Sequence, residues 1–395
     1  MSRKELFILI ILACINFTNI VDFMVMMPLA PQFEEAFSIG PTQWSIIVSS
    51  YAFAAFVSGV LSVFFIDKID RKKFLLMAYA GFIIGTFLCS TAEVYSFLVF
   101  ARILTGVFGG LIGTIVLSIV GDLIPLKRRA RAMGVVMTGF SAAAALGVPL
   151  GIYFADKFSW EVPFVAIAIF ACILFVASSF ILPSMTDHLK SEEKMSTIAT
   201  LKHIFTNKNR NLAFLFFSTL IFGHFLVIPF LSPVLVNNLG FTNQGLMYVY
   251  LFGGLCTIIT SPVIGKISDQ YGRKRIFSIL LFISAVPVLL LTNLSSNNMI
   301  YALFISSLFF IFVSGRLIPA ISMVVATAES QIRGTFMSLR SSFQQLSAGL
   351  ASFVSGFIIS KGPNDVYLNY DVTGYISVAI CLITIFLSRK LQEVY

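Results

Sequence analysis

Twelve long apolar segments follow one another along this 395-residue chain, and they constrain its fold more than any other feature. Each is close to the roughly 20 residues that a helix needs to cross a bilayer. Only 11% of the residues are charged, against about 25% in typical soluble domains. The sequence therefore predicts an all-α polytopic membrane protein. The predicted spans are approximately 6–31, 43–66, 74–92, 96–121, 132–155, 161–182, 210–236, 244–266, 276–293, 299–325, 334–360 and 372–388.

Lysine and arginine are distributed unevenly among the segments that join these spans. With the N-terminus placed in the cytoplasm, 22 of the 27 fall in cytoplasmic segments and only Lys157 and Lys361 fall outside. Cytoplasmic loops carry such an excess of positive charge. We therefore expect a protein of the cell inner (plasma) membrane with both termini in the cytoplasm. Trp44 and Trp160 then fall at the outer ends of their spans, where interfacial aromatic residues are enriched.

The spans divide into six and six around a polar stretch. This predicts an N-terminal six-helix bundle at 1–182, a cytoplasmic linker at 183–209 and a C-terminal six-helix bundle at 210–395. Apolar residues of the linker recur every three to four positions, which favours a short helix on the membrane face. A flexible linker is the alternative. These residues are Met195, Ile198, Leu201, Ile204 and Phe205.

A basic loop occurs at the same place in each half. The second copy covers 265–275, and a looser copy covers 67–73, which is 202 positions earlier. A motif repeated at half the chain length indicates a duplicated membrane domain. Glycine permits a turn with positive φ and aspartate tolerates one, so both copies predict a turn. The register aligns Asp67 with Asp269, Asp70 with Gly272 and Arg71 with Arg273.

The second copy, with its pattern G-x-x-x-D-x-x-G-R-K-R, resembles the signature loop of the major facilitator superfamily, found there between helices 2 and 3 and between helices 8 and 9. The first copy departs from it, with Val63 and Asp70 in place of the family's glycines. The resemblance covers essentially the whole chain. It implies twelve transmembrane helices in two pseudo-symmetric six-helix bundles, and alternating access around a midplane site.

The resemblance also implies a cytoplasmic gate, in which acidic and arginine groups after helices 4 and 10 pair with the signature loops. Solvated surface charge is the alternative interpretation. The gate residues would be Asp67, Arg71, Asp122, Arg131, Gly265, Asp269, Gly272, Arg273, Glu329 and Arg333.

Asp22 and Arg102 are charged residues inside predicted spans, where charge is costly unless it is paired or solvated. Asp22 lies 16 residues past Leu6, roughly 24 Å along a helix. Arg102 lies six residues into a helix that starts at the outer face, so the depths match. Its segment resembles the arginine-and-glycine motif of the family's fourth helix. We predict an Asp22–Arg102 pair that either couples transport to protons or serves structure alone.

The C-terminal half carries other polar groups inside its spans. His224 is 202 positions after Asp22, and it could carry protons or simply pack between helices. Arg316 and Arg340 fall near Gln344 and Gln345. In the family, helices 1, 4, 7 and 10 line the central cavity. This would place Asp22, Arg102, His224 and Arg316 on the cavity-lining helices, and we expect a substrate cavity that includes Arg316, Arg340, Gln344 and Gln345. Its surplus positive charge favours an anionic or hydrogen-bond-accepting cargo with an apolar part.

The fifth span contains several small residues and one proline. Small residues let neighbouring helices approach closely, and proline permits a bend. The arrangement resembles the motif that the family associates with exporters that exchange substrate for protons. It therefore favours efflux. The residues are Gly139, Gly147, Pro149 and Gly151.

These patterns together predict a secondary active transporter that exports a small amphipathic compound in exchange for protons. Uptake with protons is the alternative, and a non-transporting receptor of the same fold is a further one. The five cysteines and three histidines form no ligand cluster, so we expect no metal and no cofactor. No enzyme motif is present. The net charge of +9 is explained by the cytoplasmic loops rather than by nucleic acid. We expect a monomer.

Overall fold

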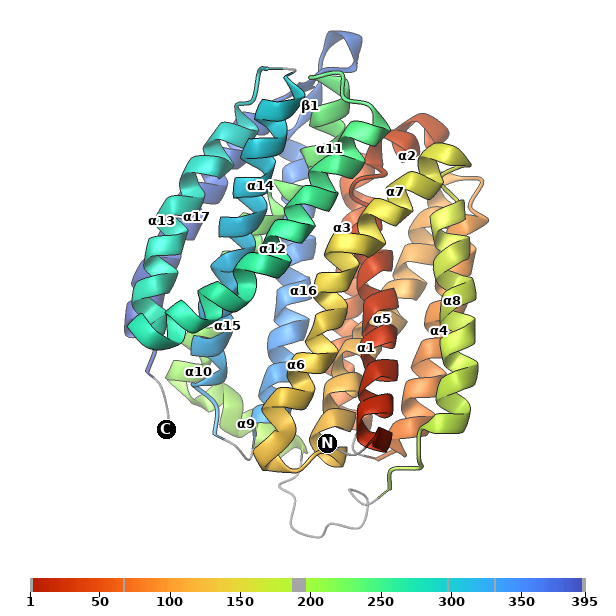
Figure 1. The fold of residues 1–395 in the computed structure, drawn as a ribbon, viewed down its shortest axis with the longest axis vertical. Helices are drawn as coiled ribbons and strands as arrows, with labels where there is room; N and C mark the ends of the chain where they lie inside the picture. The colour runs from red at the N-terminus through yellow and green to blue at the C-terminus, as the bar shows by residue number, and fades with distance from the viewer. Residues whose placement is uncertain (1–2, 67, 187–196, 297, 330–331, 393–395) are drawn as a thin grey trace.

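The computed structural model describes residues 3–66, 68–186, 197–296, 298–329 and 332–392, without the side chains of 126–127 and 129–131. Most of these residues are helical, and the long helices run side by side (Figure 1). Nine predicted spans correspond to single helices. These are α1 (Arg3–Val25), α3 (Pro41–Phe65), α4 (Arg71–Ser90), α5 (Tyr95–Leu123), α8 (Val162–Ile181), α12 (Asn243–Tyr271), α13 (Arg273–Thr292), α16 (Arg333–Ile358) and α17 (Tyr370–Lys390).

The other three spans are interrupted, each close to a proline, although Pro233, Pro262 and Pro287 lie inside helices that continue. Proline has no N–H, so the carbonyl four residues before it loses its helical hydrogen bond. Pro229 and Pro319 follow Phe225 and Gly315 by four residues, and α10 and α14 end at those two residues. Pro149 follows the π-helical turn η1. The resulting elements are α6 (Leu126–Ala142), η1 (Ala143–Gly147), α7 (Val148–Lys157), α10 (Lys208–Phe225), α11 (Ile228–Asn237), α14 (Met299–Gly315) and α15 (Leu317–Val325).

Eleven helical segments of the described chain are long and apolar enough to cross a membrane. The remaining predicted span, 334–360, is the eleventh along the chain and corresponds to α16, which has 26 residues but is much more polar. It lies in the middle of the molecule beside α3 (Figure 1). A helix covered by other helices can carry polar side chains that a lipid-facing helix cannot.

The two ends of the bundle differ. At one end, the terminal end, α1 begins and α17 ends (Figure 1). At the other, the hairpin end, lie α2 (Ala30–Phe37) and the strands β1 (Ser360–Lys361) and β2 (Tyr367–Leu368), which are joined through η3 (Pro363–Asp365). Neither α2 nor the hairpin was predicted. The first span was predicted to run to residue 31 but ends at Val25, three residues before Pro28.

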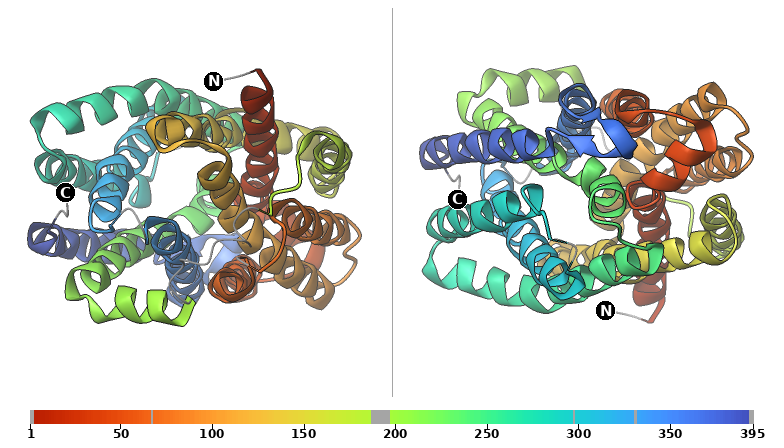
Figure 2. Two further views of the ribbon diagram at one scale, coloured as in Figure 1. Left: turned by 90° about the horizontal axis from the view of Figure 1, so that it is seen from below. Right: turned by 90° about the horizontal axis from the view of Figure 1, so that it is seen from above.

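The halves of the chain meet along two lines of helices. α3 packs along α16, and α12 packs along η1 and α7 (Figure 2). Close contact with the facing helix, through a side chain at one line and through backbone at the other, explains a glycine at each line. A methyl group at Gly59 would lie 2.5 Å from Oγ of Ser342, and one at Gly254 would lie 2.6 Å from Cα of Ala145.

Two aromatic residues that are 202 positions apart meet across the halves. The rings of Phe23 and Phe225 lie 6.0 Å apart, centroid to centroid. A contact between matching positions is what a pseudo-twofold relation between the halves produces. The division into two six-helix bundles at 182 and 210 stays a prediction.

Trp44 lies in the interior of the bundle. It was predicted to lie at the lipid interface, but it is fully buried and its Nε1 donates to the carbonyl oxygen of Pro229 at 3.0 Å.

In the linker, α9 (Thr197–Thr206) is the short helix that the apolar spacing predicted. Ile204 is buried and Ile198 is exposed, while Met195 lies outside the described residues.

Candidate functional site

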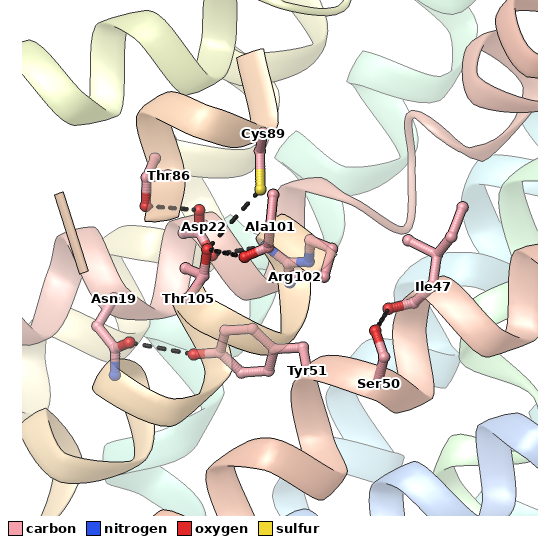
Figure 3. Close-up of polar contacts among 10 residues, drawn as sticks. All are labelled: Asn19, Asp22, Ile47, Ser50, Tyr51, Thr86, Cys89, Ala101, Arg102 and Thr105. Carbon is pink, nitrogen blue, oxygen red and sulfur yellow. Dashed lines mark hydrogen bonds and ion pairs between the residues drawn. The ribbon is translucent and has the colours of Figure 1, made fainter. Parts of the chain in front are cut away.

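Asp22 of α1 and Arg102 of α5 form an ion pair in the interior of the first half (Figure 3). NH1 of Arg102 donates to Oδ2 of Asp22 at 2.8 Å, and both side chains are at least 99% buried. Thr86 of α4 donates to the other oxygen, Oδ1, at 3.1 Å. Three helices thus meet at one carboxylate, and the equal depths predicted from the sequence correspond to a direct contact.

Tyr51 of α3 covers the arginine. The guanidinium carbon of Arg102 lies 4.5 Å from the centroid of the Tyr51 ring, a distance at which a cation is attracted to an aromatic face. The Tyr51 hydroxyl donates to Oδ1 of Asn19 at 3.1 Å, and Asn19 lies one turn before Asp22 on α1 (Figure 3). Nε of Arg102 has no partner among the described residues, so the pair keeps one unused donor.

Glycines of α5 make room for this arrangement. A methyl group at Gly109 would overlap the Tyr51 hydroxyl, and one at Gly106 would overlap the Tyr51 backbone carbonyl. The arginine-and-glycine segment therefore has a local physical basis: the arginine reaches Asp22 while the glycines admit Tyr51. Sequence analysis missed Thr86, Tyr51 and Asn19. Their only signal in the sequence is that they are polar residues inside predicted spans, and many other residues of the spans share that property.

The fifth-span glycines face the helix that carries Asp22. A methyl group at Gly139 would lie 2.6 Å from the carbonyl oxygen of Ala13, and one at Gly147 would overlap Cγ2 of Val21. Gly151 packs against Val25 in the same way. Pro149 follows the π-helical turn η1, and π-helical turns are frequent at functional sites. The segment thus forms a close, bent contact along α1.

This contact predicts a strong position dependence for added volume. Gly147→Ala should lower the midpoint of thermal unfolding, because overpacking a close contact costs about 1–3 kcal/mol. Gly134→Ala is the matched control, since a methyl group there meets no atom within 4 Å and alanine favours helices. Equal midpoints for the two variants would show that the α1 contact tolerates a side chain.

His224 of α10 does not contact the Asp22–Arg102 pair. Its ring lies 6.4 Å from that of Phe309 and 5.4 Å from that of Phe225, and its Nδ1 has no partner among the described residues. It is half-buried rather than enclosed. The histidine therefore sits among aromatic rings at the place where Phe23 and Phe225 meet.

Arg316 and Arg340 are both buried but are held by different neighbours. NH1 of Arg316 donates to Oγ of Ser284 on α13 at 2.8 Å, and its Nε and NH2 have no partner in the described chain. Arg340 of α16 donates to Oε1 of Gln344 at 3.2 Å and lies 4.7 Å above the Phe217 ring. Gln345 is half-exposed on the same helix. Both cations lie in the second half without a carboxylate partner in the described residues.

The first signature loop is held within its own half. Nε of Arg71 lies 2.8 Å from Oδ2 of Asp122 at the end of α5. Asp70 was predicted to adopt a left-handed turn, but it is extended, with φ −51°, and its carboxylate caps α4 instead. A capping carboxylate satisfies the free N–H groups at a helix start. Asp67 and the side chain of Arg131 lie outside the described residues.

The second signature loop is mostly helix, which corrects the prediction of a loop over 265–275. α12 continues through Gly265 and Asp269 to Tyr271, and only Gly272 breaks it, with φ +93°. A side chain at Gly265 would have space, so no close packing requires glycine there. Asp269 lies 3.7 Å from Nε of Arg273 one turn later; the Asp269 side chain is exposed and that of Arg273 is half-buried.

Glu329 lies beside a different partner from the one expected. Its carboxylate oxygens lie 3.6 Å from NH2 of Arg210 and 3.6 Å from Nε2 of His203. Arg333 donates to the carbonyl oxygen of Ala328 at 3.3 Å. In the described residues, Glu329 therefore ties the loop after α15 to α9 and α10 rather than to the signature loop.

Comparisons with known proteins agree on the class of molecule. The sequence profile described as Major Facilitator Superfamily matches residues 12–261 and 213–393. Among curated relatives, the uncharacterised MFS-type transporter YwfA of Bacillus subtilis is 26% identical over 92% of this chain and 87% of its own length. YtbD of the same organism, also uncharacterised, is 28% identical over 67% of this chain, and the match spans 65% of its length.

Solved structures share the fold at low sequence identity. A bacterial homologue of the human lysosomal transporter Spinster, in an inward-facing and unoccupied conformation, superposes with a TM-score of 0.80 at 14% identity, covering 99% of this chain and 98% of that one. A D-xylose–proton symporter superposes with a TM-score of 0.78 at 15% identity, covering 96% and 97%.

Proposed function

The chain belongs to the major facilitator superfamily and is a membrane transporter rather than an enzyme, and on this basis we propose that it exports a small amphipathic compound in exchange for protons. The observation that carries the proposal is the enclosed Asp22–Arg102 pair. Asp22 is the one carboxylate far from either end of its predicted span, and it receives donors from two neighbouring helices.

A proton can be exchanged at this carboxylate if the pair opens. Burial favours the neutral acid, while Arg102 and Thr86 favour the carboxylate. Alternating access changes the balance, because water and cargo reach the pair from one face at a time. Cargo and proton compete for the site if the cargo disturbs the same Arg102 contact that protonation of Asp22 breaks: binding of the proton releases the cargo, and loss of the proton restores the pair. That exchange of partners couples two fluxes.

The resemblance of the fifth span to exporter sequences supports export rather than import. Its glycines pack along α1, so a rotation of α1 that opens the Asp22 site in either direction must slide along Gly139, Gly147 and Gly151. Uptake with protons is the second candidate, and a receptor of the same fold is a third.

The buried cations suggest the chemistry of the cargo. Arg316 has two guanidinium nitrogens without partners in the described chain, and Arg340 has one. An unsatisfied buried donor costs free energy until a ligand or water satisfies it. We therefore favour a cargo with an anionic or strongly hydrogen-bond-accepting group and an apolar part.

Flux into membrane vesicles tests the function. Inside-out vesicles with an acidic lumen should accumulate a compound from an amphipathic library, and dissipation of the proton gradient should stop the accumulation. Cleavage of a C-terminal tag by added protease reports whether the terminal end is cytoplasmic, as we propose. Accumulation only in right-side-out vesicles with an acidic exterior would establish uptake instead. Gradient-independent binding without flux in either preparation would favour a receptor.

Glu34 ties the halves together at the hairpin end. This buried residue of α2 accepts a hydrogen bond from the Tyr367 hydroxyl and lies 3.1 Å from Nζ of Lys361. Burial raises the pKa of the Glu34 carboxyl against the effects of both partners. Thr42 adds a bond to the carbonyl oxygen of Gly356 at 3.0 Å. We infer that the hairpin end is closed in this conformation.

Removal of the cation should loosen this closure. Lys361→Gln is expected to speed labelling of a buried reporter, Ser45→Cys, by about tenfold in a background without the native cysteines, since breaking a buried pair leaves one partner uncompensated. Asp365→Asn is the matched control, because Asp365 is exposed and contacts the same lysine within one half. Unchanged labelling in Lys361→Gln would show that the contact of Glu34 with Lys361 does not hold the hairpin end closed.

A further inference from the structure

A cleft of about 1760 Å³ is lined by residues from the ends of α12, α13, α15 and α17. These helix ends lie at the terminal end of the second half (Figure 1). It is distinct from the Asp22 site, which lies in the first half. Its wall is strongly basic: six cationic residues line it, with Asp269 as the one carboxylate among its lining residues. The cations are Arg273, Lys274, Arg275, Arg333, Arg389 and Lys390.

The cations of this cleft are only partly used by the protein. Nζ of Lys274 donates to the carbonyl oxygen of Leu391 at 2.6 Å and so joins α13 to the end of α17. Arg275, Arg389 and Lys390 are exposed, and no ion pair to them occurs within the described residues. Like charges gathered in one concave surface repel one another, and a bound anion would relieve that repulsion.

The corresponding place in the first half shows what the second half lacks. Lys72 of α4 donates to the carbonyl oxygen of Ser179 near the end of α8, as Lys274 does at the end of α17. The local construction is therefore the same in both halves. In the first half, however, two carboxylates accompany the cations: Asp70 caps α4 and Asp122 pairs with Arg71.

Both of these carboxylates are missing from the second half. In the register of 202 positions, Gly272 replaces Asp70 and Val324 replaces Asp122. Oδ1 of Asp70 accepts from the backbone N–H groups of Lys72 and Met185, and Oδ2 accepts from Ser184 at 2.6 Å. Burial opposes ionisation of Asp70, but these hydrogen bonds outweigh it and lower its pKa. The first half thus supplies its own anion at this position.

A polar side chain without a partner marks the same cleft in the second half. Ser268 is 2% exposed and lines the cleft, and its Oγ has no hydrogen-bond partner in the described chain. No side chain caps the start of α13 at Gly272, although the N-terminus of a long helix attracts anions. A buried hydroxyl donor, a helix start and unpaired cations therefore surround one space.

We propose that this cleft binds a phosphate group, supplied by the headgroup of an anionic lipid. The cleft lies at the ends of the spans, where lipid headgroups lie, and one wall is apolar through Ile318, Ile321 and Val325 of α15. Phosphate oxygens accept from arginine, serine and backbone N–H groups together. The lipid takes the place that Asp70 fills in the first half, and the inference holds whatever the cargo is.

Lipid binding by the purified full-length protein tests this proposal. Phosphatidylglycerol should raise the midpoint of thermal unfolding in detergent more than phosphatidylcholine does. The triple variant Arg275→Gln, Arg389→Gln, Lys390→Gln should weaken the apparent affinity for phosphatidylglycerol by about tenfold or more, since each cation near an anionic surface contributes. Lys202→Gln with Lys208→Gln, at exposed sites on α9 and α10, is the matched control.

Inorganic phosphate distinguishes the source of the group. If it stabilises the protein alone, saturably, and the triple variant loses the effect, the site is a phosphate site for a soluble ligand. If only phosphatidylglycerol does so, the ligand is the lipid. An equal response to phosphatidylglycerol in the wild type and the triple variant, or no response to either phosphate compound, would overturn the proposal.

A second pair of variants tests the comparison between the halves. Gly272→Asp would supply the missing carboxylate and should reduce the stabilisation by phosphatidylglycerol at least twofold. Gly272→Asn carries the same backbone strain at φ +93° without the charge, so it should retain more of the stabilisation by phosphatidylglycerol. Identical responses of the two variants would contradict an anion position at residue 272.

Discussion

Asp22→Asn is expected to abolish transport driven by a proton gradient while leaving the amount of protein nearly normal. Asparagine keeps the size of the side chain: its one amide oxygen can still accept from Arg102, its NH2 group can donate to the Thr86 hydroxyl, and the Tyr51 ring still covers the cation, so the helices stay packed. It cannot bind and release a proton. In vesicles, accumulation of the cargo against its gradient should therefore fall to the level of vesicles without the protein, whereas equilibrium binding of the cargo should persist.

Glu93→Gln provides the control for Asp22→Asn. Glu93 is an exposed carboxylate between α4 and α5, close in sequence to the same helices, and its neutralisation should leave proton-driven accumulation unchanged. If Asp22→Asn still concentrates the cargo in a proton-dependent manner, Asp22 has a structural role only. His224, which is half-buried among aromatic rings, then becomes the residue to test.

Arg102→Ala is expected to be the most damaging single substitution at this site. It leaves the Asp22 carboxylate buried beside Thr86 without its cation, and breaking a buried ion pair in this way costs about 3–5 kcal/mol. It also removes the group that covers the Tyr51 ring. We expect a low yield of folded protein and a markedly lower midpoint of thermal unfolding, both measurable on a fluorescently tagged protein in detergent.

The double variant separates charge from packing. Asp22→Asn together with Arg102→Ala leaves no unpaired charge, so it should be more stable than Arg102→Ala alone although it changes more atoms. Residues in contact show such non-additive effects. A double variant that is no more stable than Arg102→Ala would mean that the arginine acts through its packing rather than through the ion pair.

The spans were predictable because their cause is local. Bilayer thickness sets the length of an apolar segment, and the predicted spans agree with the helices to within a few residues at most ends. The breaks at Phe225 and Gly315 were not predicted: they lie four residues before Pro229 and Pro319, but Pro262 and Pro287 stand inside unbroken helices. The turn at Gly272 follows from its freedom to adopt positive φ. The causes of the spans and of this turn lie within a few residues of their effects.

The Asp22–Arg102 contact was predictable for a different reason. Charges inside spans are rare and costly, so two opposite charges at equal depth have few alternatives to pairing. Thr86, Tyr51 and Asn19 had no such constraint, because neutral polar residues inside a span can also bond to their own helix. Ser50, for example, donates to the carbonyl oxygen of Ile47.

By itself, the sequence determined that the chain crosses a membrane in helices and which two charges meet. Only the tertiary structure decided that Trp44 is buried against Pro229, that Asp70 caps a helix, and that Glu34 meets Tyr367. The physical reason is distance along the chain. Glu34 and Tyr367 are 333 positions apart. Hydrophobic periodicity and propensity are local, so they do not specify which polar residues between the spans become buried when the two halves pack together.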